Sequence, residues 1–240
     1  EDALTAVSMA FPIQNLMIAV GAGTAVGVNA LLARSLGEKD FDRVNRIAEN
    51  AVFLVVLSYA AFLLIGLFLV EPFYRSQTDI ESIITYGKDY MVVVCCFSFG
   101  IFTQLMFERM LQATGKTVYT MFTQGVGAII NIILDPIFIF GLQWGMMGAA
   151  IATVIGQVVT AILAVWYLLH MRIIKPEAGD YALSPNIFGR MLTLGITSFL
   201  SQISLVAAMA AINNMLRKYG ALDAVFSQEQ YAQIPMAVVG

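Results

Sequence analysis

The sequence has very little charge for its length. Only 12% of its 240 residues are Asp, Glu, Lys or Arg, whereas soluble domains average about 25%, and its mean hydropathy is +0.80. Charged residues are absent from six stretches: 3–33, 50–70, 90–107, 117–134, 136–171 and 191–216. Each stretch reaches or exceeds the ~18 apolar residues that predict a membrane-spanning helix. The sequence therefore predicts an all-α polytopic membrane protein.

Several signals of other protein classes are missing as well. The 13 Lys and Arg residues form no basic stripe and no nucleic-acid-binding motif is present, so we expect no nucleic-acid partner. Cys95 and Cys96 are adjacent within a charge-free stretch, where they cannot easily close a disulfide. No CxxC motif or His/Cys cluster suggests a metal site. We interpret both cysteines as small packing residues and expect no cofactor.

The charge-free stretches predict six complete spans and the start of a seventh. The six lie at about residues 7–33, 47–70, 90–110, 119–140, 147–170 and 191–216, and the seventh begins near Gln233. The longest stretch is divided by the turn GLQWG at residues 141–145. Nine of the 13 Lys and Arg residues lie in the first, third and fifth connections. The positive-inside rule therefore places these three connections in the cytoplasm.

One acidic residue, Asp135, lies well inside a predicted span, in the stretch NIILDPIFIF. A charged Asp at the bilayer centre costs about 2.5–3.5 kcal/mol, and such residues usually mark an ion or proton pathway. Pro136 leaves the carbonyl of Ile132 without its helical donor, and Asn131 lies one turn before Asp135 on the same face. These oxygens can hold a small cation or a proton. A neutral, hydrogen-bonded structural Asp is the alternative.

The next predicted helix supplies a partner, Thr153. If the two helices are antiparallel, Asp135 and Thr153 both lie about 9 Å below the outer turn and can touch. Small residues around Thr153 form a stripe suited to close helix packing: Ala149, Gly156, Thr160 and Ala164. We expect most of this stripe to serve packing alone.

Other polar side chains in the predicted spans either line a cavity or bond a neighbouring helix: Gln124, Asn29, Gln104 and Gln202. Gln124 shares its helix face with Asn131 and Asp135. The carboxylates of Glu49 and Glu108 are expected at cytoplasmic helix ends.

Three segments, in this order and spacing, resemble the multidrug and toxic compound extrusion (MATE) family: RMLQATGKT at 109–117, NIILDPIFIFG at 131–141 and MGAAIATVIGQ at 147–157. The segment ARSLGEKDFDRVNR at 33–46 resembles the first cytoplasmic loop of that family. GITSFLSQ at 195–202 resembles the opening of its second lobe, as in the MepA-like subgroup.

The resemblance implies a family architecture of twelve helices in two six-helix lobes. It assigns residues 1–171 to the amino-terminal lobe (helices 2 to 6), 172–190 to a cytoplasmic inter-lobe linker and 191–240 to the start of the second lobe. Because the chain begins on Glu1 and ends in a new apolar run, we expect it to be a fragment without helix 1 and most of the second lobe.

The same resemblance implies secondary active efflux of small cationic or amphipathic compounds from the cytoplasm, in exchange for protons or sodium ions. It implies a monomeric protein of the cytoplasmic (inner) membrane. The ion site of the amino-terminal lobe corresponds to Asp135, Asn131, Thr153 and Tyr90. One branch of the family places a coupling glutamate on helix 7, and residues 191–216 contain no acidic residue that could match it.

Two other functions have less support in the sequence. A flippase for lipid-linked saccharides would need a basic-lined cavity, and the charge-free stretches hold no Lys or Arg. An intramembrane enzyme would need a paired Asp, a Ser/His pair or a His-rich metal site. Within the predicted spans the sequence offers one Asp, Asp135, and one interfacial histidine, His170, so we expect a transporter and not an enzyme.

Overall fold

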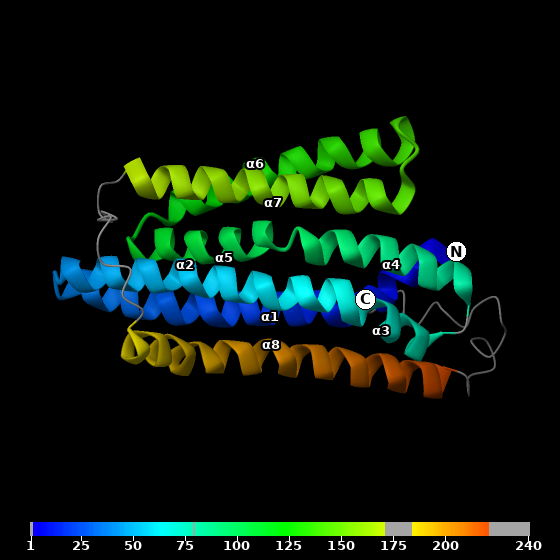
Figure 1. Ribbon diagram of the computed structural model, residues 1–240, viewed down its shortest axis with the longest axis horizontal. Helices are drawn as coiled ribbons and strands as arrows, with labels where there is room; N and C mark the ends of the chain where they lie inside the picture. Colours follow the sequence, from blue (N-terminus) through cyan, green and yellow to red (C-terminus); the bar gives the residue numbers. More distant parts are fainter. Residues whose placement is uncertain (1, 79, 171–183, 221–240) are drawn as a thin grey trace. The chain divides into compact units, whose positions relative to one another are not determined.

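The computed structural model describes residues 2–78, 80–170 and 184–220, whose regular elements are all helices. The chain divides into two compact units, Glu1–Phe199 and Leu200–Gly240, and the packing described below belongs to the first. The helices, labelled in Figure 1, are α1 (Asp2–Gly37), α2 (Phe41–Leu64), η1 (Ile65–Leu69), α3 (Val70–Gln77), α4 (Glu81–Cys96), α5 (Phe99–Ala113), α6 (Thr117–Pro136), η2 (Ile137–Gly141), α7 (Gly145–His170) and α8 (Pro185–Gly220).

The predicted membrane spans match helices among the described residues. Five helical segments are each long and apolar enough to cross a membrane, and α4 with α5, bent by 45°, makes a sixth when the pair is counted as one span. This third span begins at Glu81, nine residues before the predicted start at residue 90. Ser98 lies in the break and Gly100 in the first turn of α5, and Gly/Ser pairs are common sites of helix kinks. The predicted seventh span lies outside the described residues.

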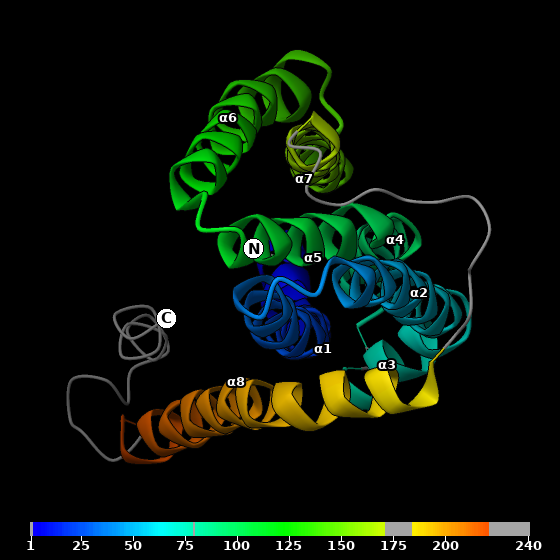
Figure 2. The same ribbon diagram turned by 90° about the vertical axis from the view of Figure 1, so that its left-hand side faces the viewer.

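Helix α5 is central to the first unit. It packs against α1 and α2 on one side and against α7 on the other, and α6 lies beside α7 (Figure 2). The interior is made of fully buried apolar side chains, including Leu32, Ile47, Met106 and Leu111. The outer faces are apolar too, as expected for helices that face lipid. On α6, for example, Val118 is 74% exposed.

The connection from α1 to α2 follows from local sequence. Gly37 ends α1, and Lys39 has a positive φ of 56° that reverses the chain direction. Asp40 then caps α2, because its carboxylate accepts a hydrogen bond from the backbone N–H of Arg43 at 3.1 Å.

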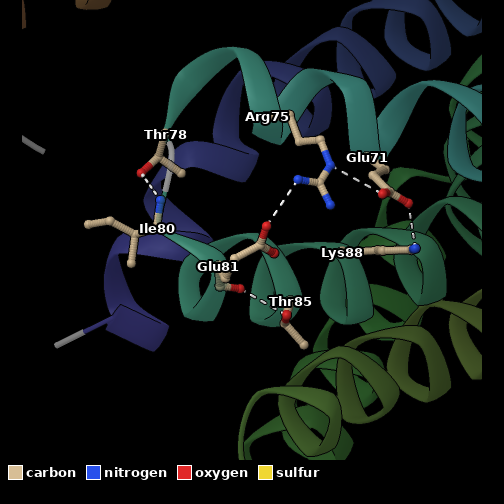
Figure 3. Close-up of polar contacts among 7 residues, drawn as sticks. All are labelled: Glu71, Arg75, Thr78, Ile80, Glu81, Thr85 and Lys88. Carbon is tan, nitrogen blue, oxygen red and sulfur yellow. Dashed lines mark hydrogen bonds and ion pairs between the residues drawn. The ribbon is translucent and has the colours of Figure 1, made fainter.

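An ion-pair network joins α3 to α4 at the end of the bundle that the positive-inside rule predicts to be outside. As Figure 3 shows, Glu71 lies between Arg75 and Lys88 and accepts from both, with distances of 3.3 Å to Arg75 Nε and 2.6 Å to Lys88 Nζ. Arg75 also pairs with Glu81 at 3.1 Å. The Tyr74 hydroxyl donates to the carbonyl of Ala6 on α1 at 2.9 Å. These contacts fix the first half of α4, and Tyr90 follows two residues after Lys88.

The start of α8, as far as Phe199, packs closely on α1. A Cβ atom at Gly27 would overlap the carbonyl oxygen of Met191, and one at Gly195 would overlap the carbonyl oxygen of Gly23. Only glycine permits this approach of the two backbones, so these glycines serve packing.

Candidate functional site

The candidate ion site begins at the end of α6, where Asp135 precedes Pro136. The chain remains helical beyond the proline, but as the wider η2 turn, in which Leu142 N donates to Ile137 O at 2.9 Å. Asp135 and Asn131 lie one turn apart and are both half-buried. Asn131 Nδ2 is 3.4 Å from Asp135 Oδ1. The α6 face therefore presents a carboxylate and an amide side by side.

Helix α7 brings Thr153 to the same place. Asn131 Nδ2 lies 3.5 Å from Thr153 Oγ1. With the amide turned over, Asn131 donates to Asp135 Oδ2 at 3.3 Å and accepts from Thr153 N at 3.3 Å. In either orientation Asn131 lies between the other two residues. The structure thus brings together Asp135, Asn131 and Thr153, as the helix spacing predicted, although Thr153 is exposed and not buried.

A glycine crossing sets the distance between α6 and α7. A Cβ atom at Gly156 would lie 3.0 Å from the carbonyl oxygen of Gly127 and 3.5 Å from Asn131 Cβ. One turn further along α7, Thr160 donates to Gly156 O at 2.9 Å and reaches the carbonyl of Thr123 at 3.4 Å. This part of the small-residue stripe packs α7 against α6, and the close crossing is what allows Asn131 to reach Thr153.

Tyr90 approaches the cluster from α4. Its half-buried hydroxyl accepts a hydrogen bond from Gln14 Nε2 on α1 at 2.8 Å, and it interacts electrostatically with Asp135. Sequence reasoning missed Gln14. The sequence signal that could have indicated Gln14 is that it is a polar side chain within the first charge-free stretch.

A cavity of about 620 Å³ lies between α4 and the turn from α6 to α7. Tyr86, Asp89, Trp144 and Ile151 are among its lining residues. Tyr86 is one helical turn before Tyr90 on α4, so the cavity lies one turn from that site residue. An acidic and aromatic lining suits an approaching cation.

The remaining polar candidates have other partners. Asn29 Nδ2 donates to the carbonyl of Arg109 at 2.6 Å and so joins α1 to α5. Gln202 is half-buried on the part of α8 that belongs to the second unit. Gln104 and Gln124 both donate to one carboxylate, that of Glu108, at 3.3 and 2.8 Å.

The position of Glu108 corrects the expectation that it lies at a helix end. It is five residues before the end of α5 and only 3% exposed. The prediction from sequence was wrong because it considered only distance from the connection. Burial of Glu108 depends on α6, which covers it with Gln124.

The Asp135 cluster offers oxygen ligands of three kinds at membrane depth: a carboxylate, an amide and a hydroxyl. Hard cations such as Na⁺ bind oxygen ligands of this type. The arrangement is therefore a candidate ion site.

Comparison with known proteins gives consistent results. A family model described as MatE matches residues 1–137. The chain is 25% identical over 229 residues to the multidrug export protein MepA of Staphylococcus haemolyticus, which covers 90% of this chain and 48% of that protein. It is 27% identical over 172 residues to the FAD transporter of Shewanella oneidensis, which covers 70% and 38% respectively. The chain thus spans about half the length, or less, of these curated relatives.

The fold agrees with a solved structure described as MATE in the straight conformation. The TM-score is 0.85 at 26% sequence identity, and the alignment covers 100% of this chain and 54% of that chain.

Proposed function

The chain belongs to the MatE family, and from this membership we propose that it takes part in secondary active efflux of small cationic or amphipathic compounds. In this proposal efflux is coupled to the entry of protons or sodium ions, and the protein works by alternating access. It is a monomeric transporter of the cytoplasmic membrane, not an enzyme. Residues 1–171 form the amino-terminal lobe, 172–190 the linker and 191–240 the start of the second lobe.

The observation that carries the proposal is the contact of Asp135 with Asn131 and, through it, with Thr153 on the neighbouring helix. An ionisable side chain inside a membrane span is destabilising, and such residues usually mark an ion or proton pathway. Here it lies among neutral oxygen ligands, so a bound cation or proton can neutralise it. Exchange of that ion between the two sides supplies the driving force for antiport.

A second candidate is transport of an anionic, phosphate-bearing compound. The similarity to the FAD transporter supports it, and the lipid-linked saccharide flippase considered above belongs to the same chemical class. Such substrates require positive charge in the cavity. The charge-free stretches contain no Lys or Arg, so we place cation export first.

The test is transport by the complete protein that carries this chain, reconstituted in liposomes. We impose an inward gradient of protons or, separately, of sodium. We expect ethidium, a lipophilic cation, to move outward, in the direction opposite to the ion. Movement should stop when the gradient is collapsed. Transport of FAD but not of ethidium would favour the second candidate, and no gradient dependence for either would contradict both.

Thr153→Val tests the contribution of α7 to the ion site. The change keeps the volume and removes the hydroxyl. A neutral ligand contributes about 0.5–1.5 kcal/mol of binding free energy. Its loss should weaken the apparent affinity for the coupling ion by about two- to tenfold, as measured from the ion dependence of ethidium transport.

Thr160→Val is the matched control for this prediction. Thr160 is also a threonine of α7, but it bonds helix carbonyls and is buried away from Asp135. The ion dependence of ethidium transport by Thr160→Val should therefore equal that of the wild-type protein. An unchanged ion dependence in Thr153→Val as well would assign Thr153 to packing.

A further inference from the structure

Glu108 is a buried carboxylate that the Asp135 site does not use. It lies on α5 within the bent third span and is 3% exposed. Each of its oxygens accepts one hydrogen bond: Oε1 from Gln104 Nε2 at 3.3 Å, one turn earlier on α5, and Oε2 from Gln124 Nε2 at 2.8 Å, on α6. The two helices therefore meet over this carboxyl group.

The chemistry of the two partners suits a group that changes its charge. Both partners are neutral amides, which have a donor and an acceptor at the same end of the side chain. They can donate to the ionised carboxylate, as here. After a half-turn of the amide they can accept from the protonated acid. A guanidinium partner could not do this, because it has only donors and favours the ionised form alone.

The charged groups near Glu108 have partners of their own. Arg109, the next residue, attracts Glu108 electrostatically, but its guanidinium donates to Gln112 Oε1 at 2.8 Å. At the start of α6, Lys116 lies over the ring of Tyr119 at 5.8 Å. On α1, Arg34 pairs with Glu38 at 2.8 Å. The other elements packed on α5 carry these ionisable groups: Arg46 and Glu49 on α2, and Tyr167 and His170 on α7.

Glu108 and Asp135 are connected by one face of α6. Gln124, Asn131 and Asp135 are spaced by seven and four residues and therefore share that face. At ~1.5 Å per residue, Gln124 lies about 16 Å from Asp135, toward the cytoplasmic end. The polar face of α6 thus carries Asp135 at one end and contacts Glu108 through Gln124 at the other end.

From this geometry we propose that Glu108, with Gln104 and Gln124 as its amide partners, is a second proton-binding site of the transporter. The carboxylate takes up one proton from the cytoplasmic side to become a neutral acid and releases it there again. The role of this site in the transport cycle rests on the proposed function. Its proton binding can be measured independently of transport.

Infrared difference spectroscopy of the complete protein in lipid nanodiscs tests the proton binding. Titration between pH 5 and 9 should show the C=O band of a buried carboxylic acid that is lost in Glu108→Gln and kept in Asp135→Asn. Gln124→Leu keeps the acid and removes one partner, so it should shift this band without removing it. This second variant also guards against a folding defect in Glu108→Gln.

Glu49→Gln is the control, because Glu49 is a half-buried carboxylate on α2 that does not contact the amide pair. It should leave the Glu108 band in place. If Glu108→Gln and wild type have the same titrating bands, Glu108 neither takes up nor releases a proton in this pH range and the proposal is wrong. The same conclusion follows if Gln124→Leu leaves every band unmoved.

A transport measurement separates this proposal from the proposed function. In liposomes, Glu108→Gln should change the dependence of ethidium transport on cytoplasmic-side pH while transport still requires Asp135. An unchanged pH dependence would overturn the role of Glu108 in the cycle. If the wild-type protein does not transport ethidium, the proposed function fails, and the infrared titration still decides whether Glu108 binds a proton.

Discussion

Asp135→Asn in the complete protein is expected to abolish ion-coupled efflux without unfolding the helices. Asn has nearly the same shape and still bonds Asn131, so the contact between α6 and α7 should persist. It can neither take up a proton nor offer a charged ligand. Loss of a charge-assisted contact of about 1.5–3 kcal/mol lowers ion affinity on the order of tenfold to a hundredfold, which should bring coupled ethidium transport close to background.

Asn131→Leu is the graded companion to this variant. It removes one oxygen ligand and leaves the titrating carboxyl, so its effect should lie between wild type and Asp135→Asn. Both are measured in energised vesicles with pH and sodium varied independently, and circular dichroism reports the helix content. Wild-type rate and ion dependence in Asp135→Asn would show that this carboxyl is structural and that the coupling mechanism proposed above is wrong.

Gly127→Val is expected to disturb the ion site although Gly127 provides no ligand. A Cβ atom there would overlap Thr160 Oγ1 and lie 3.0 Å from the carbonyl oxygen of Gly156. Valine therefore forces α6 and α7 apart, at a cost of about 1–3 kcal/mol for overpacking. Since Asn131 already reaches Thr153 at 3.5 Å, further separation breaks that contact.

Gly125→Val is the matched control on the same helix. A Cβ atom at Gly125 meets nothing within 4 Å, so valine there should leave stability and ion dependence nearly unchanged. Thermal unfolding of the purified protein and the sodium and pH dependence of transport are the two measurements. Equal behaviour of the two variants would mean that the glycine crossing does not set the geometry of the site.

The contacts within the candidate ion site were largely predictable, because its members are close in sequence or at matched positions in adjacent helices. Asn131 and Asp135 are one helical turn apart, and Thr153 lies at the corresponding depth of the next helix. A short turn forces such helices to be antiparallel neighbours. The contact of Asn131 with both residues follows from these local facts.

The charge-free stretches of this sequence determined that the chain is a membrane protein, how many spans the described residues form and where an Asp interrupts an apolar helix. Each follows from the cost of charge in lipid and from helix periodicity, which act within one segment. The tertiary structure decided that Gln14 meets Tyr90 across 76 residues, that the third span bends, and that Gln104 and Gln124 converge on Glu108. Burial of a side chain depends on which helix covers it, and that choice is made by packing between segments distant in the sequence.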